Sequence, residues 1–98
     1  MKPHEFDPEA ELELLAAADF LEAREHGLGT RFLLAVHRAI ERLKYDPASR
    51  PKVLSDVHRQ PVEDFRFDVL YLDEPDQIWI VAVVHYSRRA GYWRKRLR

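Results

Sequence analysis

The segment IWIVAVVHY, residues 78–86, is apolar at almost every position. Successive side chains of an extended strand point to opposite faces, so this segment is apolar on both of its faces. It is far shorter than the ~20 residues that a helix needs to cross a bilayer. We therefore predict a central strand in a sheet that is covered on both sides. Strict alternation would place Trp79, Val81, Val83 and His85 on one face, and Ile78, Ile80, Ala82, Val84 and Tyr86 on the other.

The N-terminal half of the chain has helical periodicity. A helix is predicted over residues 8–27, because Asp7 can cap it and Pro8 suits a first position that needs no backbone N–H. Its apolar stripe is predicted to consist of Leu12, Leu15, Ala16 and Phe20, broadened by Leu14, Ala18 and Leu21.

A second helix is predicted over residues 28–47, with Thr30 as its cap. Its apolar stripe is predicted to consist of Phe32, Val36, Ala39, Ile40 and Leu43, widened by Leu33. The connection between the two helices is short, which favours an antiparallel helical hairpin.

Strand patterns dominate after Pro51, and a short strand is also predicted at residues 4–6. Residues 65–72 alternate, with Phe65, Phe67, Val69 and Tyr71 on one side. Residues 53–65 fit either an edge strand or a bulge. The predicted order is β-α-α-β-β-β with a short C-terminal helix, which is an α+β fold in which the hairpin packs on a small, mainly antiparallel sheet. Residues 1–98 are predicted to form a single domain, because this length is typical of one domain.

The charge of the chain is unevenly distributed. The net charge is -1, but residues 1–49 carry 6 basic and 10 acidic residues, whereas residues 50–98 carry 10 and 7. The basic residues after the central strand are Arg88, Arg89, Arg94, Lys95, Arg96 and Arg98, with no acidic residue among them. This balance argues against a general nucleic-acid coat protein and allows a local basic surface.

No cofactor or metal is expected. The chain has no cysteine, and His4, His26, His37 and His58 do not have the spacing of a metal site. With no apolar segment that resembles a signal peptide or a membrane span, we expect a soluble, cytoplasmic protein without membrane contact.

Several short motifs in order resemble one family. They are PEA (8–10), FLE (20–22), LG..F (28–32), DP (46–47), FRFDVLY (65–71) and I.IVAVVH..RR..YW..R (78–96). Together they cover almost the whole chain and resemble the RelE/ParE superfamily of toxins from bacterial type II toxin-antitoxin systems, more narrowly its plasmid-stabilisation-type members. The C-terminal motif is the most specific.

The resemblance implies a growth-inhibiting toxin held silent in a hetero-oligomer with a cognate antitoxin protein. ParE-like members bind and trap DNA gyrase, whereas RelE-like members cut mRNA on the ribosome. The nearly neutral charge of this chain favours the ParE-like interpretation slightly. A RelE-like endoribonuclease and a degenerate protein that only binds antitoxin remain the alternatives.

The nuclease alternative would use Arg59, His85, Arg88 and Arg89. Cleavage needs a group that takes the 2′-hydroxyl proton, an acid for the leaving oxygen, and cations for the phosphorane charge. Histidine suits either proton role, and an arginine fork suits a phosphate. As the simpler interpretation, His85 only bonds a neighbour and Arg59 forms an ion pair with Asp68 or Glu63.

A binding function would use a wider basic surface. The residues predicted to contact a target or an antitoxin are Arg88, Arg89, Tyr92, Trp93, Arg94 and Arg96. Alternatively, Trp93 packs back on the domain and the residues after it form a solvated tail. The antitoxin is expected to bind an apolar groove beside the hairpin and a sheet edge, whose location the sequence leaves open.

Overall fold

The structure, a computed structural model, describes residues 1–97, so Arg98 lies outside the described residues. Strand β1 (His4–Phe6) leads into helix α1 (Pro8–Arg24) and then α2 (Leu28–Leu43). A 3₁₀ turn, η1 (Pro47–Ser49), precedes β2 (Lys52–Leu54), β3 (Val57–Pro61), β4 (Phe67–Asp73) and β5 (Ile78–His85), and a second, η2 (Tyr92–Arg96), follows. The predicted α+β fold is confirmed. The undecided region contributes two short strands, β2 and β3, where one was expected.

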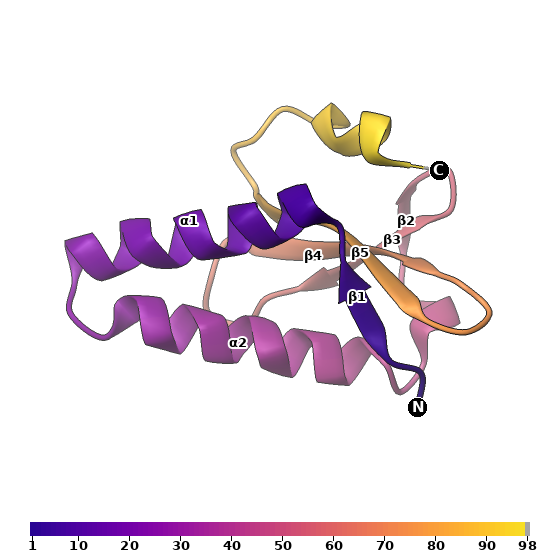
Figure 1. Cartoon of the computed structure of the whole chain (residues 1–98), viewed down its shortest axis with the longest axis horizontal. Coiled ribbons are helices and arrows are strands. Elements are labelled where there is room, and N and C mark those ends of the chain that lie inside the picture. Colours follow the sequence, from indigo (N-terminus) through magenta and orange to yellow (C-terminus); the bar gives the residue numbers. More distant parts are fainter. Residues whose placement is uncertain (98) are drawn as a thin grey trace.

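The sheet has the order β1-β5-β4-β3-β2, with β1 parallel to β5 and the other pairs antiparallel. The hairpin of α1 and α2 covers one face (Figure 1), while η2 lies against the other side of β5. The predicted two-sided cover of β5 is therefore present, but the second cover is only a short turn.

The ends of the helices show how the hairpin is fixed. The Asp7 side chain accepts a hydrogen bond from the Glu9 N–H at 2.9 Å, as predicted for the cap of α1. Thr30 does not cap α2. Instead the Glu22 carboxylate of α1 accepts the N–H groups of Gly27 and Gly29 at 2.9 and 3.0 Å, and these bonds lower the pKa of Glu22. A side chain at Gly29 would meet the Ala18 carbonyl oxygen at 2.5 Å, so glycine permits the close approach of the helices.

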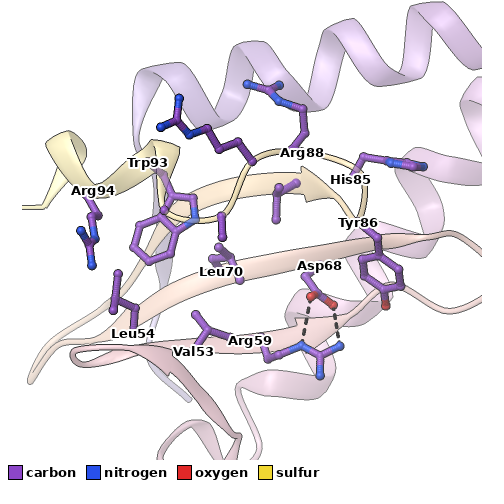
Figure 2. A pocket seen from close by; sticks show the side chains of 14 residues that line it. Val53, Leu54, Arg59, Asp68, Leu70, His85, Tyr86, Arg88, Trp93 and Arg94 are labelled. Carbon is purple, nitrogen blue, oxygen red and sulfur yellow. Dashed lines mark hydrogen bonds and ion pairs between the residues drawn. The ribbon is translucent and has the colours of Figure 1, made fainter.

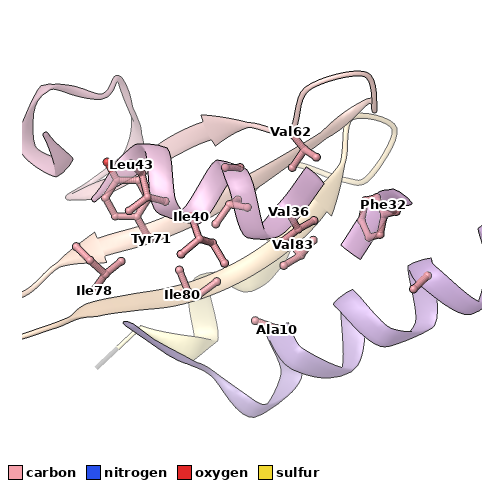
Figure 3. Close-up of a cluster of buried hydrophobic side chains, with 13 residues drawn as sticks. Ala10, Phe32, Val36, Ile40, Leu43, Val62, Tyr71, Ile78, Ile80 and Val83 are labelled. Atoms are coloured by element: carbon pink, nitrogen blue, oxygen red, sulfur yellow. The ribbon is translucent and has the colours of Figure 1, made fainter. Parts of the chain in front are cut away.

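The main core lies between the hairpin and the sheet (Figure 3). The predicted stripe of α2 is confirmed, and it packs on the sheet residues Val69, Tyr71, Ile78, Ile80 and Val83. Leu33 is 38% exposed and does not join it. Tyr71 is fully buried, and its hydroxyl donates to the Pro47 carbonyl at 2.6 Å, which ties the sheet to η1.

The prediction for α1 was wrong in its main stripe and correct in the residues that broadened it. Leu12, Leu15 and Phe20 are 66%, 50% and 61% exposed, whereas Ala18 is buried with Ala10, and Leu14 and Leu21 pack against the core. Apolar and charged residues are spread around this helix without one clear apolar face, so periodicity alone cannot select its inner face. The small alanines face inward because they allow α1 to lie close to α2 and β5.

A β-bulge changes the faces of β5. Tyr71 pairs with Ile80 and Leu70 with Ala82, so Val81 is an extra residue. Val83 therefore joins the core on the hairpin side, and Val81 and Ala82 both pack in the smaller cluster with Trp93. Strict alternation was wrong here because it assumed an uninterrupted strand. Trp79 is only partly buried, against that smaller cluster.

Candidate functional site

A groove of about 560 Å³ lies on the sheet face opposite the hairpin (Figure 2), and we call it the open-face groove. Its floor is formed by β2, β3, β4 and the end of β5, and its wall by residues 86–91 and η2. The predicted site residues that line it are Arg59, His85, Arg88, Arg89, Trp93 and Arg94. Side chains from distant parts of the sequence thus meet at one surface.

The floor of the groove holds a closed ion pair. Arg59 Nε donates to Asp68 Oδ2 at 3.0 Å, and Nη2 donates to Oδ1 at 3.2 Å. Asp68 is buried, and its hydrogen bonds raise the pKa of Arg59. The fork of Arg59 that could hold a phosphate is therefore engaged by a carboxylate of the same sheet. Of the two predicted partners, Asp68 is the correct one, because Glu63 pairs with Arg42 on α2.

His85 lies at the rim, where β5 ends. Its ring packs edge-on against Phe67 and points away from the Arg59–Asp68 pair in Figure 2. The Ser87 N–H donates to His85 Nδ1 at 3.0 Å. Because a backbone N–H can only donate, Nδ1 is the acceptor, and neutral His85 carries its hydrogen on Nε2. The exposed nitrogen therefore offers a hydrogen rather than taking one.

Three arginines form the wall. Within residues 1–97, Arg88, Arg89 and Arg94 have no acidic partner within ion-pair distance. The Arg88 guanidinium lies 4.2 Å from the centre of the Tyr92 ring, which orients it without neutralising it. All three residues are exposed. The positive charge of the groove therefore comes from this wall and not from its floor.

Two residues predicted to bind a ligand face inward instead. Only 6% of the Arg96 side chain is exposed, and its guanidinium donates two hydrogen bonds to Glu13. The Tyr92 hydroxyl also donates to Glu13, and burial raises the pKa of Tyr92. Neither residue lines the groove, because the side chains of both are hydrogen-bonded to Glu13 on α1. Trp93 is 4% exposed and packs on the domain, as the simpler interpretation had it, while also lining the groove.

A second groove, of about 770 Å³, lies beside the hairpin, and we call it the hairpin groove. Its apolar lining comes from α1, the start of α2 and the entry to β4, namely Ala16, Phe20, Leu21, Leu28, Phe65 and Phe67. Its charged lining consists of three arginines, Arg24, Arg66 and Arg88, and two acids, Glu25 and Asp64. Arg88 and His85 are shared with the open-face groove. The outward leucines of α1, Leu12 and Leu15, extend the apolar surface of this helix.

The described part of the chain has neither a group of side chains suited to a metal ion nor a helix suited to crossing a membrane. Among residues 1–97, no three histidine, aspartate or glutamate side chains are grouped so as to hold a metal ion. Over the same residues, no helix has the length and apolar character that crossing a membrane requires.

Sequence reasoning missed Glu13, which makes more of the local hydrogen bonds than any predicted site residue. The available signal was its place in α1: Glu13 is next to Leu14 and shares the inward side with Ala10 and Ala17. A carboxylate at such a position needs an internal partner. This signal was missed because the main apolar stripe of α1 was predicted on the side of Leu12 and Leu15.

Comparison with known proteins gives a fold but no sequence family. No family model matches the chain, and no curated protein matches it. Among solved structures, a chain of the structure titled "Chromosomal ParDE TA system from P. aeruginosa" superposes with a TM-score of 0.73 at 16% sequence identity. The match covers 87% of this chain and 96% of that chain. The two chains therefore share their fold.

Proposed function

We propose that this chain is the toxin of a type II toxin-antitoxin module, and that it acts by binding its target through the open-face groove. The observation that carries the proposal is the row of exposed arginines, Arg88, Arg89 and Arg94, that line one groove and have no acidic partner among residues 1–97. The shared fold with a chain from a ParDE structure supports the same class. The ParE-like form, in which the toxin binds DNA gyrase and inhibits growth, is the favoured one.

The geometry of the groove favours binding over RNA cleavage. Arg59 is engaged by Asp68, so it is not free to hold a phosphate, and the exposed nitrogen of neutral His85 carries a hydrogen, so it cannot take the 2′-hydroxyl proton. The RelE-like alternative is favoured by one observation, that Arg59, His85, Arg88 and Arg89 line the same groove. It would require Arg59 to exchange its present partner, and His85 to do so as well if it served as the base.

For the antitoxin we propose the hairpin groove. Its apolar lining suits one face of an amphipathic helix, and Arg24, Arg66 and Arg88 suit acidic residues at the edge of such a helix. The strongly exposed Phe20 would be covered by this partner. Arg88 lines both grooves, so an antitoxin bound in the hairpin groove would also cover Arg88 and make it unavailable to the target.

Induced expression in a bacterial host without the partner gene tests the toxin proposal. Growth arrest is expected from the wild-type chain and not from an Arg88→Glu/Arg89→Glu variant. The matched control, Arg31→Glu/Arg38→Glu, reverses two charges on the exposed side of α2 and should arrest growth normally. A harmless wild-type chain would contradict the proposal and favour the degenerate protein.

Two assays then separate the targets. A gyrase supercoiling assay with purified protein should show inhibition or trapped cleavage complexes under the ParE-like proposal. RNA ends that cluster at codon boundaries after induction, with normal supercoiling, would instead establish the nuclease alternative.

A further inference from the structure

Among residues 1–97, no strand pairs with the outer edge of the second half of β5. Strand β1 pairs only with residues 78–80, and the last bond on this side runs from the Asp7 N–H to the Ile80 carbonyl. Beyond it, two side chains replace the missing strand. The Val83 N–H donates to Glu13 Oε1 at 3.2 Å, and Arg96 Nη1 donates to the Val81 carbonyl at 3.0 Å. The free backbone groups at the Val81 bulge therefore have hydrogen-bond partners on α1 and on η2.

Glu13 is the centre of this arrangement. Its two oxygens accept from Arg96 Nη1 and Nη2 at 2.9 and 3.0 Å, and from the Tyr92 hydroxyl. Glu13 is 15% exposed, and Arg96 is 6% exposed. The other facing acid, Glu9, lies 3.4 Å from Arg96 Nε but is 54% exposed. Glu13 is therefore the main partner of a nearly enclosed cation.

The arginines of the groove wall depend on how η2 is held. Residues 86–91 contain no helix or strand and connect β5 to η2. Arg88 is oriented by the Tyr92 ring. The Arg96 guanidinium also lies near this ring, 5.2 Å from its centre. Three sets of contacts hold η2: Trp93 packs on Leu70 and Val81, Arg96 donates to the Val81 carbonyl, and Glu13 binds Tyr92 and Arg96. The contacts with α1 are those of Glu13, together with the ion pair of Arg96 with the exposed Glu9.

We propose that Glu13 is a positioning residue that holds η2 on the open edge of β5 and thereby orients Arg88, Arg89 and Arg94 over the open-face groove. The first part stands on the contacts alone, and the second rests on the proposed function. Loss of the Glu13 charge leaves Arg96 enclosed without its main partner, which is strongly unfavourable. Because η2 is joined to β5 through residues 86–91, which have no helix or strand, it can detach and carry the charge into water while the hairpin-side core stays folded.

Limited trypsin digestion of the full-length Glu13→Gln variant tests the first part. Cleavage after Arg94, Lys95 or Arg96 requires η2 to open, so it should be at least ~10-fold faster than in wild type, at an unchanged rate of exchange for the β4 amides. Glu9→Gln removes an exposed carboxylate near the same guanidinium and should digest like wild type. Equal digestion of the Glu13→Gln and Glu9→Gln proteins would overturn the proposal. If Glu13→Gln does not fold, Tyr92→Phe removes one bond to Glu13 and should give a smaller increase.

The double variant Glu13→Gln/Arg96→Gln separates positioning from direct contact. It removes both enclosed charges, so η2 should dock again and the rate of digestion should return most of the way to the wild-type value. Growth arrest on induction should be lost in Glu13→Gln and regained in the double variant, since the three wall arginines are intact. A Glu13→Gln chain with an open η2 and full toxicity would overturn the positioning role. If wild type itself is harmless, the proposed function fails, while digestion still decides whether Glu13 holds η2.

Discussion

The two faces of the sheet are built in different ways. The face under the hairpin buries a continuous apolar cluster contributed by α1, α2, β4 and β5. The open face has a smaller cluster, Val57, Leu70, Val81, Ala82 and Trp93, and among the described residues its cover is a short 3₁₀ turn. On the first face apolar burial supplies stability, and on the second a few specific contacts hold charged side chains at a groove. This chain therefore concentrates its apolar burial on one side of the sheet and holds the three arginines of the open-face groove on the other.

Phe32→Ala is expected to have the largest effect on stability. Phe32 is fully buried between the hairpin and the sheet and packs against Phe65 and Phe67. Truncation removes apolar contacts and leaves a cavity, which costs about 3–5 kcal/mol for a buried aromatic residue. Chemical denaturation should show this loss as a lower midpoint. A loss below about 1 kcal/mol would mean that the hairpin face does not dominate stability.

Trp93→Ala should affect the fold less, although a tryptophan is larger. Trp93 is as buried as a core residue, but it belongs to a short turn that is joined to β5 through residues without helix or strand and that can detach. The loss of global stability is therefore limited to the docking energy of η2, which we place below ~3 kcal/mol. Hydrogen exchange should speed up at the Arg94 and Leu97 amides and remain slow in β4. Uniform acceleration across the sheet would show that the two faces unfold together.

Asp68→Asn should sharpen the contrast within the open face itself. The change removes the charge that engages Arg59, at a cost of about 1 kcal/mol for a partly exposed pair. It also leaves the Arg59 guanidinium available in the groove, so the protein should elute from a heparin column at higher salt. Glu63→Gln removes the same charge from an exposed pair with Arg42 outside this groove and serves as the control. Equal elution of the two variants would show that Arg59 does not contribute to anion binding.

The same contrast explains how much could be predicted from sequence. The stripe of α2 and the alternation of β4 were predicted correctly, because each element buries one clear face. The face of α1 was wrong because Leu12 and Leu15 compete with Leu14 at helical spacing, and only the fit of Ala10 and Ala18 against their neighbours decides. On the open face, the closed pair of Arg59 and the inward turn of Arg96 depend on Asp68 and Glu13. Such contacts between distant residues have no local periodicity.

The smallest expected effect is a dependence on pH that comes from the hairpin side of the molecule. Burial, followed by the charge of Lys44, lowers the pKa of His4 below its usual 6.5. The unfolded chain then binds more protons than the folded chain below about pH 6.5, so stability is constant above this value and falls as the pH drops toward the lowered pKa. Urea midpoints measured at about pH 7.5 and about pH 5.5 should differ less in His4→Gln than in wild type. His26→Gln, which changes a fully exposed histidine, is the control and should keep the wild-type difference.

In contrast, the shifted groups on or beside the open face, Arg59, Tyr92 and Arg96, all have raised pKa values, so their charge states are the same at both pH values. Mild acid should therefore weaken the hairpin side while the cations of the groove persist, and an unchanged pH difference in His4→Gln would remove His4 as the cause.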